Sequence, residues 1–220
     1  MRVVRAVAGV LAAALLLAGC AAVAAGSESS DGVRVSFYGD SYTRGKAASA
    51  ESARWSTIVS AAHGWTELNH GIDGLGFVRQ RASFADDDVP SAIIAEQPDM
   101  VIVALGLNDN FVYDRAADRI REQIGVDFDR LADGLPDARI IVVEPFWYSD
   151  QRPDSVDVIA AWVRDSAAEH GFEYIAGASR WLEGHPEWMA DDVLHPNDAG
   201  YAELARRMNE ELAALAPPVG

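Results

Sequence analysis

The sequence contains a single cysteine, Cys20, and only 18 lysine and arginine residues against 34 aspartates and glutamates. One cysteine rules out any disulfide within the chain. The formal net charge is −16, so the chain repels nucleic acid and offers no basic patch to bind it. We therefore expect no nucleic-acid partner.

Several signatures of metal and cofactor binding are also missing. The sequence has no His-Glu-x-x-His motif, no cysteine cluster, no EF-hand loop, no Walker P-loop and no dinucleotide-binding Gly-x-Gly-x-x-Gly. The acidic run Asp86-Asp87-Asp88 precedes Pro90, and we interpret it as a solvated loop rather than a calcium site. The sequence thus predicts neither a metal nor a cofactor.

One long apolar stretch is present, at the N-terminus. Arg2 and Arg5 precede residues 7–17, which are apolar but too few to span a bilayer comfortably. The stretch ends in Leu-Ala-Gly-Cys, which looks like a bacterial lipobox with Cys20 as the lipid-bearing residue. An ordinary secretory signal cleaved near residue 22 is the alternative.

The lipobox interpretation divides the chain into three parts: residues 1–19 as a lipoprotein signal peptide, residues 20–31 as a tether and residues 32–220 as one domain. It predicts an exported protein that contacts a membrane through a lipid on Cys20. The oligomeric state is not predicted.

Apolar runs and amphipathic stretches alternate along the remaining chain. The strand candidates are residues 33–38, 65–69, 99–104, 139–144 and 172–176. Between them, apolar side chains recur at helical spacing, and Asn197 is suited to cap the last helix. This order predicts an α/β fold, a three-layer α/β/α sandwich around a five-stranded parallel sheet.

Residues suited to nucleophilic catalysis follow these strand candidates. Ser41 lies in a Gly-Asp-Ser turn after the first, and His195 lies near the C-terminus in an Asp-x-x-His arrangement with Asp192. A serine hydroxyl needs a base to accept its proton, and the base needs an acid to orient it. Asp191 is the alternative acid. No Gly-x-Ser-x-Gly elbow surrounds Ser41, which argues against the α/β-hydrolase fold.

Further polar groups are expected at the same sheet edge. Asn108, in Gly-Leu-Asn-Asp, and Gly74 follow the third and second strands and are candidate donors to an oxyanion. Asp40 and Asp109 are expected to hold their turns by accepting backbone N–H groups.

Together these motifs resemble the four sequence blocks of the SGNH, or GDSL-type, hydrolase family, in family order across residues 33–213. The resemblance implies a flavodoxin-like sandwich, a catalytic Ser41, His195 and Asp192, and an oxyanion hole made by Ser41, Gly74 and Asn108. Gly71 and Gly76 compete with Gly74 for the glycine of the second block. Tyr42 departs from the family, which usually has leucine or isoleucine there.

The resemblance also implies an ester hydrolase that works through an acyl-enzyme on short-chain acyl esters or on acetylated carbohydrate or lipid. An acyltransferase with the same residues, or a non-catalytic lipid-tethered protein that binds glycan or lipid, are the alternatives. Aromatic residues are the only hint of a substrate-binding wall, and the candidates are Tyr42, Phe146, Trp147 and Trp188.

Overall fold

The computed structural model describes residues 32–81 and 88–215. The predictions for residues 1–31, including the lipid on Cys20, and for Asp86 and Asp87 lie outside these ranges. Asp88 is described and is not a solvated loop residue. It caps a helix, accepting a hydrogen bond from the Ser91 amide, and pairs with Arg81 and Arg130.

The five predicted strands are confirmed and form one parallel sheet in the order β2-β1-β3-β4-β5. Their bounds are β1 Arg34–Gly39, β2 Thr66–Gly71, β3 Met100–Ala104, β4 Arg139–Val143 and β5 Glu173–Ile175. All five residues of β3 are buried, because helices cover the central strand on both faces.

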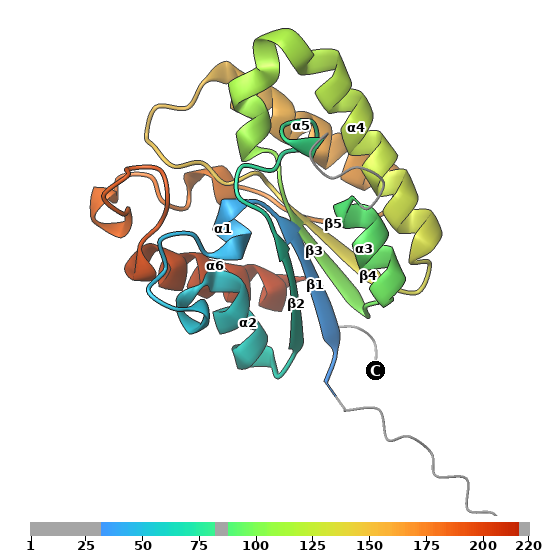
Figure 1. The fold of residues 1–220 in the computed structure, drawn as a ribbon, viewed down its shortest axis with the longest axis horizontal. Helices are drawn as coiled ribbons and strands as arrows, with labels where there is room; N and C mark the ends of the chain where they lie inside the picture. Colours follow the sequence, from blue (N-terminus) through green and yellow to red (C-terminus); the bar gives the residue numbers. More distant parts are fainter. Residues whose placement is uncertain (1–31, 82–87, 216–220) are drawn as a thin grey trace, which may run out of the picture. The chain divides into compact units, whose positions relative to one another are not determined.

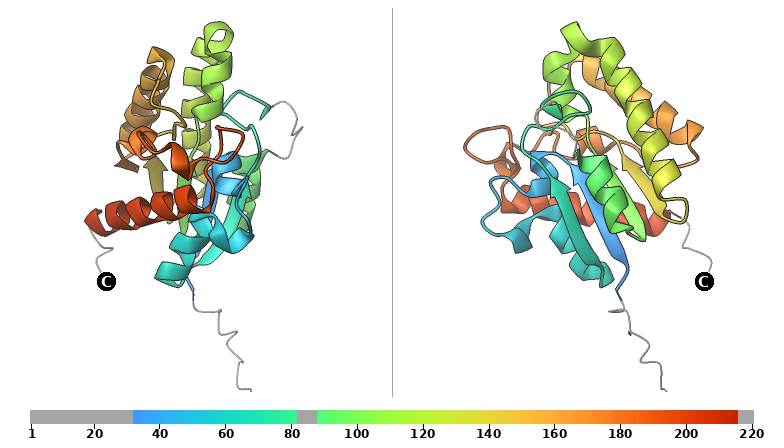
Figure 2. Two further views of the ribbon diagram at one scale, coloured as in Figure 1. Left: turned by 90° about the vertical axis from the view of Figure 1, so that its left-hand side faces the viewer. Right: turned by 45° about the vertical axis from the view of Figure 1, so that its right-hand side comes forward.

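Helices form the two outer layers, as Figures 1 and 2 show. One face is covered by α2 (Trp55–His63) and α6 (Asp198–Ala214), and the other by α3 (Val89–Glu96), α4 (Tyr113–Gly134) and α5 (Asp154–Glu169). Alternate strand residues serve the two cores: Val35 and Phe37 pack toward α2 and α6, and Tyr38 packs toward α4. The predicted three-layer sandwich is therefore confirmed.

Local signals mark the ends of two helices, and the cap predicted for the last helix is present. Asn197 caps α6, its side-chain oxygen accepting hydrogen bonds from the Ala199 and Gly200 amides. Helix α2 ends at His63, and Gly64 follows in the left-handed conformation with φ 68°.

The strand order reverses at β1, which has β2 on one side and β3 on the other. In open parallel sheets, ligands bind beyond the carboxyl ends of the strands at such a reversal. The segments that leave β1 and β3 therefore begin side by side at the place where a site is expected.

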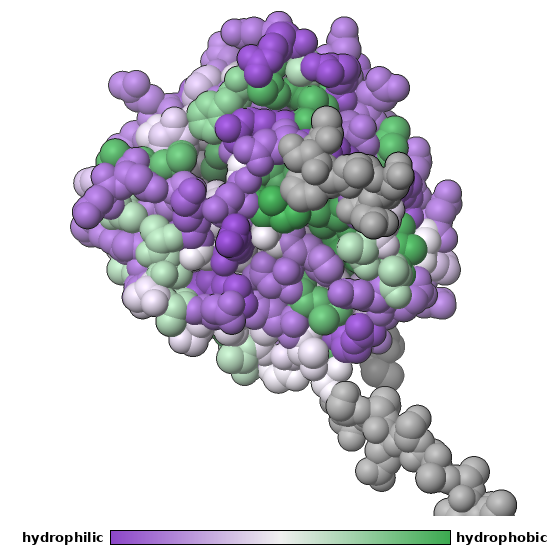
Figure 3. Space-filling model, in the orientation of Figure 1, coloured by the Kyte–Doolittle hydropathy of each residue, from purple (hydrophilic) through white to green (hydrophobic). Residues whose placement is uncertain are grey.

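The surface agrees with the acidic composition. Hydrophilic side chains cover most of the face shown in Figure 3. No helix within residues 32–81 and 88–215 has the length and hydropathy needed to cross a membrane.

A buried ionic cluster attaches the segment after β2 to α4. Asp127 on α4 is fully buried and accepts hydrogen bonds from both terminal nitrogens of Arg81 and from the Tyr38 hydroxyl at 2.8 Å. Burial raises the pKa of Asp127, and Arg81 opposes that rise. Loss of the carboxylate would leave a half-buried guanidinium with one fewer partner.

We expect Asp127→Ala to lower the free energy of unfolding by about 3–5 kcal/mol, the usual consequence of breaking a buried pair. Asp129→Ala is the control, because Asp129 lies on the same helix with its side chain 72% exposed. Its loss should cost at most about 1 kcal/mol. Urea unfolding of the two variants measures both, and equal losses would show that the Arg81 pair is not a stabilising attachment.

Candidate active site

Ser41 is the first residue of the short helix α1 (Ser41–Arg44), directly after β1. Asp40 caps this helix, its Oδ1 accepting the Tyr42 amide at 2.9 Å. The other oxygen, Oδ2, accepts a hydrogen bond from Asn108 Nδ2 at 3.1 Å. Burial raises the pKa of Asp40 to about 7, although both hydrogen bonds favour the carboxylate. Asp40 thus joins the turn after β1 to the turn after β3.

The structure brings Ser41, His195 and Asp192 into one hydrogen-bonded chain. The Ser41 hydroxyl lies 2.9 Å from His195 Nε2, and His195 Nδ1 lies 2.6 Å from Asp192 Oδ2. Ser41 and His195 are 6% and 5% exposed, so the contact between them is largely shielded from water. With Nδ1–H donating to the carboxylate, Nε2 is left to accept the serine proton.

Asp192 also shapes the loop that carries the histidine. Its Oδ1 accepts the backbone N–H groups of Leu194 and His195 at 3.0 and 2.9 Å. Burial raises the pKa of Asp192, but the hydrogen bonds from His195 and the two amides outweigh burial and lower it to about 2. Val193 lies inside this turn at φ 52°, a strained value for a β-branched residue. Asp191 is exposed and makes no hydrogen bond to the ring.

A histidine–carboxylate pair alone would not identify the site. Three other histidines also contact carboxylates, at 2.8 to 3.0 Å: His70 with Glu96, His170 with Asp129 and His185 with Glu187. Within the described part of the chain, His195 is the one whose second ring nitrogen reaches a serine hydroxyl.

Three groups that could stabilise an oxyanion line the cavity around Ser41: the amides of Ser41 and Gly74 and the side chain of Asn108. Neither the Ser41 nor the Gly74 amide has an acceptor among the described residues. Asn108 Nδ2 is already engaged, with Asp40 Oδ2 at 3.1 Å and the Leu75 carbonyl at 3.0 Å. The two backbone amides are therefore the donors that the structure leaves free.

The three competing glycines of the second block have different surroundings. A Cβ on Gly71 would lie 2.2 Å from the backbone nitrogen of Arg44, and one on Gly76 would lie 2.5 Å from the Asp109 carboxylate. Both glycines thus allow close packing. Gly74, with φ 76°, is the one of the three that lines the cavity.

Asp109 holds this second-block segment in place. Its carboxylate accepts the backbone N–H groups of Phe77, Val78 and Arg79 at 2.6 to 3.1 Å. Burial raises the pKa of Asp109, and these amides oppose the rise. Asp40 and Asp109 therefore both hold turns through backbone amides, as the sequence predicts.

Two adjoining cavities open at this edge of the sheet. The cavity that contains Ser41 and His195 measures about 370 Å³. The second measures about 650 Å³ and has mostly apolar walls, among them Leu182, Pro186 and Met189. Phe111 and Leu194 line both cavities. An ester bound at Ser41 would thus have room for a different group on either side of the reacting carbon.

Among the predicted substrate-binding residues, Tyr42 alone lines the Ser41 cavity. Phe146, Trp147 and Trp188 line neither of these two cavities. Trp147 does line a third cavity, which shares Tyr148 and Ser149 with the second. A substrate-binding role for these three residues stays a prediction. Phe146 and Trp147 are 3% exposed, because the chain after β4 folds back onto the core, where the Phe146 ring stacks on Tyr42. Trp188 packs at the edge of the same core and stacks on His185.

Tyr42, where the family usually has an aliphatic residue, has a further contact. Its hydroxyl donates to the Leu194 carbonyl at 2.8 Å and so ties the nucleophile turn to the histidine loop.

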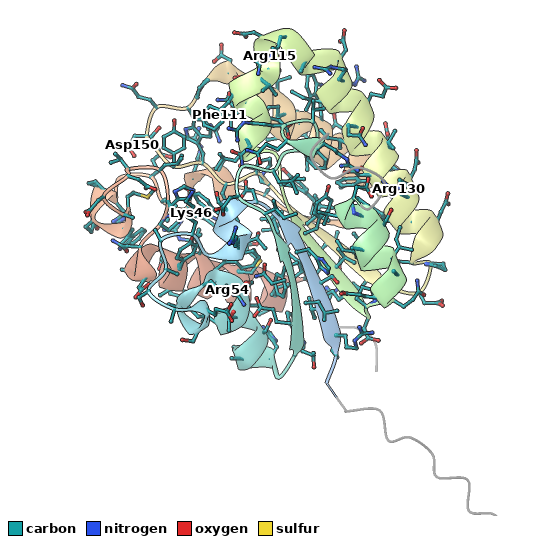
Figure 4. The ribbon with its side chains drawn as sticks, in the orientation of Figure 1. Lys46, Arg54, Phe111, Arg115, Arg130 and Asp150 are labelled. Atoms are coloured by element: carbon teal, nitrogen blue, oxygen red, sulfur yellow. The ribbon has the colours of Figure 1, made fainter. Side chains whose placement is uncertain are left out.

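Sequence reasoning missed several residues that line the Ser41 cavity. They include Lys46, Arg79 and Phe111, and also Asp73, Gln80, Leu107 and Leu194. Figure 4 shows Lys46 and Phe111 beyond the carboxyl ends of the strands. Lys46 carried a signal, because it is the single lysine of the chain and lies five residues after Ser41. Arg79 and Phe111 carried none, since arginines and aromatic residues are spread over the sequence.

Comparisons with known proteins agree with this geometry. The GDSL-like lipase/acylhydrolase family model matches residues 37–203. Over 120 residues the chain is 28% identical to a GDSL lipase of Mycobacterium tuberculosis, covering 52% of this chain and 51% of that protein. The chain therefore spans about half the length of the curated relative it matches.

Solved structures share the fold. An acetylxylan esterase from Geobacillus stearothermophilus superimposes with a TM-score of 0.62 at 22% identity, covering 82% of this chain and 94% of that one. The psychrotrophic esterase from Pseudoalteromonas sp. gives 0.63 at 12% identity, covering 83% and 97%. Since the family model spans most of the sequence, the chain belongs to the GDSL-like lipase/acylhydrolase family.

Proposed function

We propose that the protein hydrolyses carboxylic esters with Ser41 as nucleophile, His195 as general base and acid, and Asp192 as the group that orients His195. The observation that carries the proposal is the hydrogen-bonded chain from Ser41 Oγ to His195 Nε2 at 2.9 Å and from His195 Nδ1 to Asp192 Oδ2 at 2.6 Å. These contacts lie within the range needed for proton transfer.

In the first half of the reaction, His195 accepts the Ser41 proton while Oγ attacks the ester carbonyl carbon. Asp192 stabilises the imidazolium that forms. The amides of Ser41 and Gly74 donate to the developing oxyanion. Asn108 joins them if Nδ2 exchanges its bond to the Leu75 carbonyl for one to the oxyanion. His195 then protonates the leaving alcohol, and an acyl-enzyme on Ser41 remains.

In the second half, a water molecule takes the place of the alcohol. His195 accepts a proton from the water as its oxygen attacks the acyl carbon, and then returns a proton to Ser41 Oγ. The products are one carboxylic acid and one alcohol. An acyltransferase would differ only in the acceptor, a hydroxyl group instead of water.

The substrates we propose are short-chain acyl esters, or acetyl groups on carbohydrate or lipid. The small size of the Ser41 cavity, about 370 Å³, supports a short acyl group. The printed activity of the structural neighbour from Geobacillus stearothermophilus, an acetylxylan esterase, supports an acetylated carbohydrate. A non-catalytic binding protein is disfavoured, because the chain has a serine, a histidine and an aspartate at bonding distance.

We expect Ser41→Ala and His195→Ala each to lower kcat on a short-chain aryl ester by at least about 10⁴-fold, with the double variant little worse than either. The losses do not multiply because the two residues act as one unit. Steady-state kinetics on the three variants tests this. A Ser41→Ala protein that still turns over would refute the proposed nucleophile.

We expect Asp192→Asn to lower kcat by about 10⁴-fold, because the amide stabilises the wrong tautomer of His195. Asp191→Asn removes the same charge one position earlier and should leave kcat unchanged. Thermal unfolding of both variants checks that they fold. The assignment of Asp192 as the acid is wrong if Asp191→Asn is the more damaging substitution.

We also propose that the protein is exported and anchored to a membrane by a lipid on Cys20. The support is the sequence: Arg2 and Arg5, the apolar residues 7–17 and the lipobox that ends at Cys20. Without Arg2 and Arg5 the mature chain has 16 basic and 34 acidic residues, a formal charge of −18. Such a charge gives no attraction to anionic lipid, so the acyl chains would supply the attachment.

We expect Cys20→Ala to move the esterase activity from the membrane fraction to the soluble fraction, and a chain that starts near Ser27 to be soluble and fully active. Fractionation with the intact mass of the wild-type protein measures this. Unmodified wild-type protein in the medium, cleaved beyond Cys20, would instead indicate an ordinary signal peptide.

A further inference from the structure

Arg79 is a partly buried cation on the wall of the Ser41 cavity. Its Nη1 donates to two neutral acceptors, the Gly74 carbonyl and Asn108 Oδ1, each at 2.9 Å. Its Cζ lies 5.7 Å from the centre of the Phe111 ring. No carboxylate within the described residues lies within salt-bridge distance of Arg79. The guanidinium therefore has a full charge and further N–H groups for an anionic ligand.

Lys46, the single lysine of the chain, lines the same cavity. Its Nζ lies 3.6 Å from Asp73 Oδ2, and Arg44 Nη1 lies 3.4 Å from the same oxygen. Two cations thus share one carboxylate, and Lys46 is only partly neutralised. In a chain of formal charge −16, two of the few cations border the cavity of the nucleophile.

Three nearby carboxylates, Asp40, Asp109 and Asp192, do not neutralise the positive charge of Arg79 and Lys46 on the cavity wall. Asp40 and Asp109 are buried behind the wall, do not line it, and accept hydrogen bonds from backbone amides. Asp192 lines the second cavity instead and pairs with His195. An anionic group that enters the Ser41 cavity would meet two cations, Arg79 and Lys46, and one carboxylate, Asp73, which is paired with Lys46.

Chemistry decides which half of an ester occupies which cavity. His195 must protonate the leaving oxygen, so the alcohol lies on its side of the site. The second, mostly apolar cavity is lined by the residues just before His195, namely Asp192, Val193 and Leu194. The acyl group then occupies the Ser41 cavity, whose lining includes Gly74, Asn108 and Arg79.

We propose that the preferred substrate is a half-ester of a short dicarboxylic acid, whose free carboxylate is bound by Arg79 with help from Lys46 and whose apolar alcohol fills the second cavity. The planar guanidinium matches the geometry of a carboxylate and can bind it through two N–H groups. This inference rests on the proposed ester hydrolysis and adds the substrate class.

The test compares benzyl hemisuccinate with benzyl butyrate, which share the alcohol and the length of the acyl chain but differ by one carboxylate. The measured quantity is the ratio of kcat/KM for the two esters, anionic over neutral. We expect a ratio above one for the wild type, decreasing with added salt because screening weakens the attraction. Arg79→Gln should lower the ratio at least about tenfold, chiefly through the KM of the hemisuccinate.

Three further variants act as controls. Arg79→Lys keeps the charge and should recover part of the ratio, and Lys46→Gln should lower it by a smaller factor. Arg121→Gln changes the net charge equally, but Arg121 is exposed on α4 and does not line either cavity, so its ratio should equal that of the wild type. Thermal unfolding checks that every variant folds.

Several outcomes would overturn the inference while leaving ester hydrolysis intact. One is a wild-type ratio below one. Another is an equal loss on both esters in Arg79→Gln, which would mean that Arg79 acts through Asn108 or the oxyanion. A third is a larger gain when the carboxylate is on the alcohol, as in 4-carboxybenzyl butyrate. If neither benzyl ester is cleaved, the inference fails, and absence of Ser41 labelling by a fluorophosphonate then refutes the proposed function as well.

Discussion

The parallel pairing of β1 with β3 is the constraint on which the site depends. It places the Gly-Asp-Ser turn after β1 beside the Gly-Leu-Asn-Asp turn after β3. The buried Asp40 carboxylate then joins the two turns through the Tyr42 amide and Asn108 Nδ2. Burial raises the pKa of Asp40 and disfavours its charged form. The hydrogen bond that each carboxylate oxygen accepts from an N–H group compensates part of this cost. Ser41 is therefore held in a fixed position at the carboxyl end of β1.

His195 lies near the C-terminus of the chain, and separate contacts hold its loop against the Ser41 turn. Tyr42 donates to the Leu194 carbonyl, and Met189 and Pro196 form an isolated antiparallel bridge that closes the loop. Asp192 accepts the next amides of the same loop, and Val193 adopts a strained backbone conformation within it. Strain of this kind persists where surrounding contacts over-determine the backbone. The result is a ring nitrogen 2.9 Å from the Ser41 hydroxyl, although 154 positions separate the residues.

The site also divides by polarity. On one side lie Arg79 and Lys46 with the glycine amide, and on the other lies an apolar cavity of about 650 Å³. Phe111, 43% exposed, stands between the two sides and packs against Arg79. The ring attracts the guanidinium through a cation–π contact and holds it at the wall of the Ser41 cavity.

The sequence by itself located the five strands to within about two residues, because apolar runs of strand length alternate with helical periodicity. It also determined Ser41, Asp192 and His195 as candidates, because their motifs are short and local. Only the tertiary structure decided the rest. Phe146 and Trp147 pack into the core on the α2 and α6 side, where burial of a large aromatic ring is favourable. Arg79 lines the same cavity as Lys46 because separate loops bring the two residues together, and the sequence distance between them does not predict this.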